Sequence, residues 1–232
     1  KEEMRSMAFL TFRGGIHPYD GKDLSKNCSV EKYLPKGDLA ILVSQHIGAP
    51  AKPIVKKGDH VLAGQKIAEA GGFVSAPIHS SVSGIVKGIE KRLTAVGAMG
   101  DAIIIENDGL YESVEYTPAK LSDLSKEDIL KRIQEGGVVG QGGAGFPTHV
   151  KLSPKEPDKI DHILVNGAEC EPYITSDYRR MMEEPESVVG GLEVILKAFP
   201  KAVGCICIED NKPEGIAKLQ ELVEGEANIV WK

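Results

Sequence analysis

The sequence predicts a chain of mixed fold class, in which an all-β module is followed by an α/β domain built on a parallel sheet. Residues 37–116 contain short apolar runs separated by Gly-Asp, Pro and Asn-Asp-Gly turns, and little in them is helical. Residues 161–231 alternate apolar strands with amphipathic helices, which is the order of a parallel sheet with right-handed crossovers. We therefore expect an N-terminal arm (1–36), the β module (37–116) and the α/β domain (117–232).

The composition suits a globular protein and excludes some functions. Of the 232 residues, 41% are hydrophobic, which is enough for a packed core. The net charge of -6 argues against a nucleic-acid surface, which needs clustered Lys and Arg. No apolar run reaches the roughly 18 residues that span a bilayer, and the first residues lack the apolar core of a signal peptide. Membrane contact is therefore expected only through a partner.

The expected elements follow from local signals. Four apolar runs mark strands of the β module, at 39–44, 52–55, 84–89 and 102–106. A helix is expected after Ser125, because Ser125 suits the N-cap, Asp128 the capping-box position and Gly136 the stop. The remaining α/β elements alternate, with strands at 161–167, 202–210 and 227–231 and helices at 176–183, 185–199 and 211–225.

The last expected strand ends one residue before the end of the sequence. A parallel strand that is buried on both faces normally needs a covering helix. We therefore expect the α/β domain to be truncated at its C-terminus, so that the sequence is an N-terminal fragment, with Val230 and Trp231 exposed or covered by another chain.

The four cysteines, Cys28, Cys170, Cys205 and Cys207, have spacings that fit neither a disulfide framework nor a metal or iron–sulfur site. This usage predicts a reducing, cytoplasmic compartment and no metal site in the chain. Cys205 and Cys207 should point to the same face of a strand and pack in the core.

Residues 136–151, "GGVVGQGGAGFPTHVK", contain the pattern GxGxxG at Gly140, Gly142 and Gly145. A helix precedes this pattern where the dinucleotide fingerprint needs a strand, and no Gly-Lys-Ser/Thr follows, so neither an ordinary Rossmann loop nor a Walker A loop is predicted. One interpretation is a flexible linker, although linkers are usually more polar. The other is close approach of the backbone to a flat or phosphorylated ligand.

Three stretches resemble known families. "GQGGAGFPTHVK" resembles the flavin-loop pattern GRGGAGFPTGxK of the NADH-oxidising subunit of respiratory complex I, and "NGAECEPYITSDYRRMMEEP" resembles the pattern NADESEPGTxKDRxLMExDP of the same subunit. "VKKGDHVLAGQKIAEAGGFVSAPIHSSVSGIVKGIE" is similar to a biotinyl/lipoyl-like hybrid β-barrel. With the opening "FRGGIHP", this order resembles the C subunits of Rnf complexes, which are ion-pumping ferredoxin:NAD oxidoreductases. The resemblance covers essentially the whole chain.

The resemblance implies a hybrid barrel followed by a flavin domain of the complex I type. It implies an oxidoreductase subunit that binds FMN and NAD(H) and passes electrons between NAD(H) and ferredoxin, with 4Fe-4S clusters in the parent protein beyond residue 232. The implied partners are the other Rnf subunits and, through the complex, ferredoxin. The implied location is peripheral, at the cytoplasmic face of the membrane. The isolated chain is not expected to be fully active.

The resemblance also implies roles for individual residues. The backbone of Gly140, Gly142, Gly143 and Gly145 would form a cradle for FMN and its phosphate. Three side chains would contact the nucleotides, each with a simpler alternative: Lys151 at a phosphate or flavin (or solvated), Phe146 on adenine (or in the core), and Asn166 at the flavin (or forming a turn before Gly167).

Glu169 and Glu171 are the candidate catalytic residues by the same resemblance, since they would tune the flavin potential and contact the nicotinamide ribose or carboxamide. The simpler alternative is that both are solvated. Cys170 stands where the complex I pattern has Ser, and we interpret it as packing. Ala168 stands in place of the pattern's Asp, and "LSPK" replaces the aromatic residues that follow Lys151 in that pattern.

Two other functions fit parts of the sequence. A lipoyl or biotinyl carrier presents a lysine at a hairpin tip, but the expected tip falls near Phe73 and holds no lysine, so we expect the module to be unmodified. The other alternative is a non-catalytic adaptor, like the A subunit of the sodium-pumping NADH:quinone reductase.

Overall fold

The computed structural model describes residues 18–225 and 228–231, and it divides into two compact units. One, the barrel unit, is formed by Glu31–Ile163 and Gly190–Gly204. The other, the α/β unit, is formed within the described chain by residues 18–30, Leu164–Val189, 205–225 and 228–231. The units are defined by contacts and combine distant segments, so the predicted limits at residues 36 and 116 stay a prediction.

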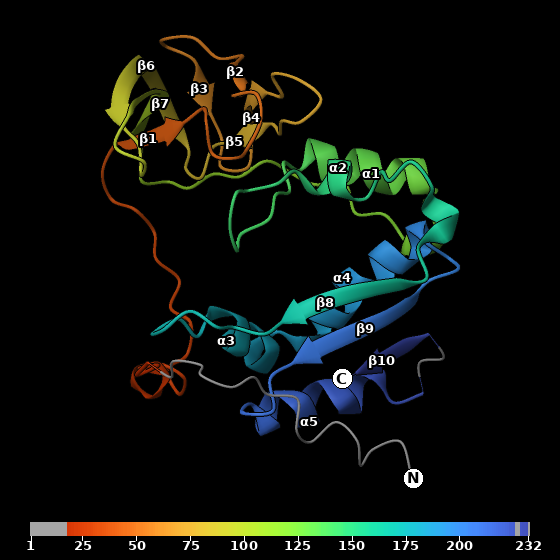
Figure 1. Cartoon of the computed structure of the whole chain (residues 1–232). Coiled ribbons are helices and arrows are strands. Elements are labelled where there is room, and N and C mark those ends of the chain that lie inside the picture. The colour runs from red at the N-terminus through yellow and green to blue at the C-terminus, as the bar shows by residue number, and fades with distance from the viewer. Residues whose placement is uncertain (1–17, 226–227, 232) are drawn as a thin grey trace, which may run out of the picture. The chain divides into compact units, whose positions relative to one another are not determined.

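Seven strands form the β module, and every pair among them is antiparallel. They curl around a common core in Figure 1. One sheet has the order β1-β7-β6-β3 and the other the order β2-β4-β5. The strands are β1 (Leu39–Leu42), β2 (Lys52–Pro53), β3 (His60–Val61), β4 (Lys66–Glu69), β5 (Ile78–His79), β6 (Gly84–Leu93) and β7 (Met99–Asn107). The predicted strand at 52–55 is therefore shorter than expected.

The core of the β module comes from aliphatic residues of both sheets, with four consecutive buried residues on β7. Val86 on β6 pairs with Ile105 on β7, and both are fully buried with Ile103. A register shift between Val86 and Gly88 marks a β-bulge on the long hairpin. The buried cluster comprises Ile41, Val43, Ala51, Val61, Ile67, Ala68, Ile78, Val82, Val86, Ile103 and Ile105.

The barrel unit also holds α1 (Lys126–Glu135) and the short α2 (Thr148–Lys151), on either side of the glycine-rich stretch. The predicted capping box is confirmed, because Ser125 Oγ accepts from the Asp128 N–H and the Asp128 carboxylate accepts from the Ser125 N–H. Gly136 follows as the C-cap of α1. Short 3-10 turns lie at Leu121–Asp123 and Pro157–Lys159.

A three-stranded sheet of order β10-β9-β8 forms the α/β part of the chain. It contains β8 (His162–Gly167), β9 (Val203–Ile208) and β10 (Ile229–Trp231). β8 and β9 run in the same direction in Figure 1. Between them in sequence come α3 (Ser176–Glu183) and α4 (Pro185–Ala198), and α5 (Pro213–Val223) follows β9. This is the predicted strand–helix alternation.

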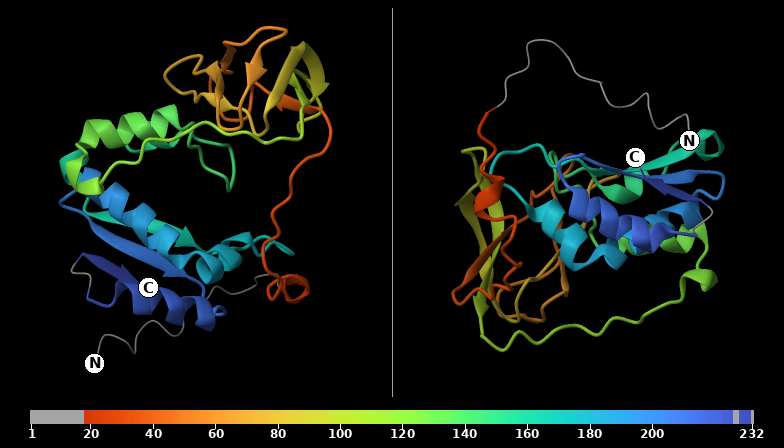
Figure 2. Two further views of the ribbon diagram at one scale, coloured as in Figure 1. Left: turned by 180° about the vertical axis from the view of Figure 1, so that it is seen from behind. Right: turned by 90° about the horizontal axis from the view of Figure 1, so that it is seen from below.

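Close packing positions the helices. Gly204 on β9 lets α4 approach, since a Cβ there would lie 2.8 Å from Cδ2 of Leu192. Within the α/β unit, α3 packs against α5, as Figure 2 shows. Val230 is exposed, as expected, whereas the side chain of Trp231 lies outside the described residues. None of the helices in the described ranges combines the length and hydrophobicity of a membrane span.

Candidate functional site: a glycine loop and an acidic loop

Residues 140–146, here called the glycine loop, leave the chain and return to it like a hairpin. At the base, the Gly140 N–H donates to the Phe146 carbonyl over 3.0 Å, and the Thr148 N–H donates to the Val138 carbonyl over 3.0 Å. The chain thus leaves α1, makes the loop and enters α2. A flexible linker would not need this closure, so the local geometry favours a defined loop.

Two glycines of this region are required by the fold itself. Gly137 and Gly145 have φ values of +64° and +65°, a region that side chains other than glycine rarely adopt. A Cβ at Gly145 would lie 2.9 Å from the Gln45 carbonyl oxygen, and one at Gly137 would lie 2.5 Å from the Pro77 carbonyl oxygen. The Ile47 N–H also donates to the Ala144 carbonyl. The protein's own packing therefore explains Gly137 and Gly145.

The other glycines of the loop have no such explanation. A Cβ on Gly142 or Gly143 would meet no atom within 4 Å, and one on Gly140 would make only ordinary contacts at 3.8 Å. Within the described part of the chain, the N–H groups of residues 141–146 find no acceptor. Successive backbone N–H groups can bind an anion where they point into one concavity. These three glycines are therefore free to approach a ligand.

Phe146 and Lys151 flank this free backbone. Phe146 is 41% exposed, so the alternative of a core aromatic is wrong. The Lys151 side chain is exposed and has no hydrogen bond or ion pair among the described residues. Both side chains are thus available, and their roles toward a nucleotide stay predictions.

His149 was missed by the sequence analysis, although it stands where the complex I pattern has Gly. It lies on α2 and is buried, and its Nδ1 has no hydrogen-bond partner among the described residues. Burial lowers its pKa below the ordinary histidine value. The lowered pKa favours the neutral form of the imidazole. His149 lies close in sequence to the glycine loop.

The acidic loop, residues 168–175, follows β8 in the α/β unit. Asn166 ends the strand, and its Oδ1 accepts from the Ala168 N–H over 3.1 Å. This is the turn-forming alternative for Asn166, and a flavin contact stays a prediction.

Cys170 is exposed, so its interpretation as a packing residue is wrong. Cys205 and Cys207, on β9, do share a face, with their Sγ atoms 3.7 Å apart.

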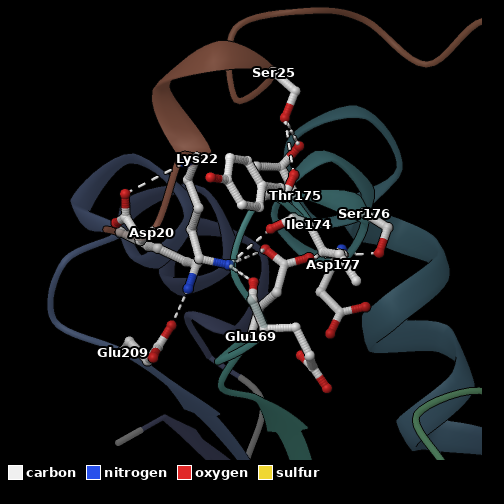
Figure 3. Close-up of polar contacts among 12 residues, drawn as sticks. Asp20, Lys22, Ser25, Glu169, Ile174, Thr175, Ser176, Asp177 and Glu209 are labelled. Carbon is white, nitrogen blue, oxygen red and sulfur yellow. Dashed lines mark hydrogen bonds and ion pairs between the residues drawn. The ribbon is translucent and has the colours of Figure 1, made fainter. Parts of the chain in front are cut away.

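Glu169 is almost completely buried, with 2% of its surface exposed. Its Oε1 accepts from the Asp177 N–H over 2.8 Å and so caps the N-terminus of α3, whose N-cap residue Thr175 makes no side-chain cap. Its Oε2 lies 3.7 Å from Lys22 Nζ and makes no hydrogen bond within the described chain (Figure 3). The alternative of a solvated carboxylate is therefore wrong for Glu169.

Glu171 differs from Glu169, because its side chain is exposed and, among the described residues, only its carbonyl is hydrogen-bonded, by Lys22 Nζ at 3.0 Å. The two predicted catalytic carboxylates are thus not equivalent: one is buried and paired, and the other is open. The alternative of a solvated carboxylate remains for Glu171.

A cavity of about 290 Å³ adjoins the acidic loop inside the α/β unit. Its lining is mixed in charge, and Lys212, which is buried and paired with Glu209, forms one wall. The lining residues come from the N-terminal arm, the acidic loop, α3 and the segment at the start of α5: Asp20, Lys22, Asp23, Lys26, Asn27, Glu169, Thr175, Tyr178, Asn211, Lys212 and Glu214. The described residues include no cluster of three or more His, Cys, Asp or Glu that could hold a metal ion.

The glycine loop belongs to the barrel unit and the acidic loop to the α/β unit. The structure therefore describes each loop by itself. A single site that contains both stays a prediction.

Comparison with known proteins matches each of the two regions of the chain to a domain family. Residues 10–110 match the RnfC barrel sandwich hybrid domain, and residues 133–230 match the Nuo51 FMN-binding domain. The chain is thus a barrel sandwich hybrid domain followed by a flavin-type α/β domain, as the sequence predicted.

Similar proteins that contain both kinds of domain narrow the comparison to one kind of subunit. The chain is 44% identical, over 93% of its length, to the C subunit of the proton-translocating ferredoxin:NAD(+) oxidoreductase complex of Clostridium ljungdahlii, and it covers 48% of that protein. It is 41% identical, over 94% of its length, to the Na(+)-translocating counterpart of Acetobacterium woodii, and covers 50% of it. The C subunit of an ion-translocating oxidoreductase complex from Haemophilus influenzae is 36% identical. The chain is thus similar to the C subunits of ion-translocating ferredoxin:NAD(+) oxidoreductase complexes, and it spans about half the length of the first two relatives.

Proposed function

We propose that this chain forms the FMN- and NAD(H)-binding part of an ion-pumping electron-transfer complex. The complex would pass electrons between NAD(H) and ferredoxin through flavin and iron–sulfur clusters. The RnfC relatives are named for ferredoxin:NAD(+) oxidoreduction with proton or Na(+) translocation. Its partners would be the other subunits of that complex, with ferredoxin reached through them and the membrane met only at the cytoplasmic face through partner subunits.

The observation that carries this proposal is the free backbone of the glycine loop. Gly142 and Gly143 leave room that a side chain would fill, and the N–H groups of residues 141–146 have no acceptor in the described chain. The loop lies inside the region that matches an FMN-binding domain. A flat ring can lie against such a backbone and a phosphate can accept its N–H groups, so these residues fit FMN.

The flanking side chains would complete the site. Lys151 would place a positive charge at a phosphate, and the exposed ring of Phe146 would stack on the adenine of NAD(H). Asn166 would add a hydrogen bond from its amide nitrogen, since its Oδ1 is used by Ala168. The exposed carboxylate of Glu171 would contact the nicotinamide ribose or carboxamide, while the buried Glu169 would fix the loop that presents it.

The flavin supplies the conversion between two-electron and one-electron transfer, and the chain supplies binding and orientation. The free N–H groups of the glycine loop would favour an anion, and the exposed carboxylate of Glu171 would place a negative charge at the acidic loop. The iron–sulfur clusters would be held by the parent protein beyond residue 232.

Titration of the chain with FMN, followed by flavin fluorescence and absorbance, tests the proposal directly. Saturable binding of one FMN per chain is expected, with riboflavin binding more weakly because it lacks the phosphate. No binding of FMN by the chain, and no flavin in the intact parent protein, would favour the adaptor function instead.

A further inference from the structure

The N-terminal arm, residues 18–30, runs along the acidic loop and α3 within the α/β unit. The Tyr173 N–H donates to the Asp20 carbonyl over 2.5 Å, and Ser25 Oγ lies 2.9 Å from Thr175 Oγ1. Farther along the arm, Arg179 donates to the Lys26 carbonyl. The arm thus contacts the loop at several points that no sequence pattern indicated.

The end of the arm is fixed by a carboxylate. The Val30 N–H donates to Glu183, which Arg179 also binds through two nitrogens. Arg179, and after it the Val30 N–H, lower the pKa of Glu183 below its ordinary value. Glu183 therefore stays charged while it holds the arm against α3.

Lys22 makes the central contact of the arm, as Figure 3 shows. Its Nζ donates to the Ile174 carbonyl over 2.7 Å and to the Glu171 carbonyl over 3.0 Å. The same atom lies 3.7 Å from Oε2 of Glu169, and the Lys22 side chain is only 13% exposed. One ammonium group therefore binds both sides of the acidic loop. Among the described residues, no other cation pairs with Glu169.

The loop that Lys22 binds has a strained backbone. Tyr173 has φ +67°, which is rare for any residue other than glycine. The two carbonyls that Lys22 binds, at Glu171 and Ile174, bracket this residue. Gly21 leaves room for the ring, since a Cβ at Gly21 would lie 2.3 Å from the Tyr173 ring. Strained backbone persists only where its surroundings hold it, and here the arm is what holds it.

We propose that Lys22 is a positioning residue for the acidic loop. Its charge compensates the buried carboxylate of Glu169, and its hydrogen bonds hold the turn at Tyr173, so that Glu171 is presented to the ligand in one geometry. The inference rests on the proposed function, since positioning has a purpose only if the loop meets a nucleotide. Loss of one partner of a buried ion pair leaves an uncompensated charge, which is the costly case.

The test compares Lys22→Met with Lys26→Met in the chain. Met keeps the length and apolar character of the lysine stem and removes the charge. Lys26 is the matched control, because its side chain is 46% exposed and its ion pair is with Asp23, which is 74% exposed, and such surface pairs contribute little. Two readouts are needed: hydrogen exchange of the amides of residues 170–176 without ligand, and the rate of NADH oxidation by the FMN-loaded chain or parent protein.

Lys22→Met is expected to raise amide exchange in the acidic loop by about tenfold or more and to slow NADH oxidation by about tenfold, while Lys26→Met changes both by less than about twofold. Lys22→Arg should recover most of the rate, since it keeps the charge. Lys22→Met combined with Glu169→Gln should restore part of the exchange protection, because no uncompensated charge is left buried.

The outcomes separate this inference from the proposed function. A normal rate of NADH oxidation in Lys22→Met, with the unmutated chain or parent protein active, overturns the positioning role even if amide exchange rises. Unchanged amide exchange in Lys22→Met would mean that Lys22 does not hold the acidic loop. If the unmutated chain and the parent protein bind no FMN, the proposed function fails and the positioning role falls with it, whatever the exchange data show about Lys22.

Discussion

In the glycine loop the backbone is left without protein partners, whereas in the acidic loop the polar groups already bind one another. The N–H groups of residues 141–146 have no acceptor in the described chain, and Gly142 and Gly143 face open space. In the acidic loop, Glu169 is buried, caps α3 and pairs with Lys22. The glycine loop thus has backbone donors that a ligand can use. The polar groups of the acidic loop instead stabilise the conformation of that loop.

This difference teaches what each loop can contribute. A backbone with free donors can receive an anion without breaking any internal bond, which favours affinity. A loop fixed by a buried ion pair and a strained turn favours geometry, because its exposed members are held in place. Mutations in the two loops should therefore have different effects. Those in the glycine loop should weaken FMN binding, and those in the acidic loop should disorder the loop or slow NADH oxidation.

The largest expected effect is that of Gly142→Val. The side chain would occupy the open space where the ligand should lie, so FMN affinity should fall by about 100-fold or more, equivalent to ~2.7 kcal/mol. Stability should change by less than about 0.5 kcal/mol, because the site is exposed and the new Cβ meets no protein atom. Titration with FMN and urea unfolding of the same variant measure the two quantities.

Gly145→Val in the same loop is the matched control. Its φ of +65° and the 2.9 Å approach to the Gln45 carbonyl should destabilise the barrel unit by about 2–4 kcal/mol. If Gly142→Val instead unfolds the chain, or binds FMN normally, the proposed separation between ligand-facing and fold-required glycines is wrong.

Lys151→Ala should weaken FMN binding less than Gly142→Val does, by about 1.5–2.5 kcal/mol if the lysine donates to a phosphate. The side chain has no partner among the described residues, so its removal should leave stability unchanged. Riboflavin separates the two causes: its affinity should be the same with and without Lys151. An equal loss for riboflavin would place Lys151 against the ring instead of the phosphate.

The elements that were predicted correctly rest on local signals. The capping box at Ser125 and Asp128 and the Pro185 start of α4 need only a few neighbouring residues. The buried strands of the β module follow from apolar runs such as 102–106, which lie within β7. Such features are encoded where they occur, so one sequence is enough to predict them.

The features that could not be predicted depend on distant partners. Gly142 and Gly145 look alike in sequence, and they differ because Gln45, about a hundred residues earlier, approaches only the second. Lys22 lies 149 residues from Glu171 in the sequence. Nothing near Lys22 marks it as the partner of the acidic loop. His149 gave one signal, its departure from the family pattern, and the sequence analysis did not use it.

The smallest expected effect on binding, and the sharpest test of the acidic loop, is that of Glu171→Gln. The side chain is exposed and makes no bond that holds the loop within the described chain, so the amide should leave loop order and FMN affinity unchanged within about twofold. Removal of the charge beside the nicotinamide should slow NADH oxidation by about tenfold, or ~1.4 kcal/mol of activation free energy. NADH-to-ferricyanide rates of the FMN-loaded chain or parent protein measure this, with Glu221→Gln, an exposed glutamate on α5, as the control. A normal rate in Glu171→Gln would mean that the open carboxylate is only solvated. A loss of FMN would mean that Glu171, like Glu169, serves the shape of the site and not its chemistry.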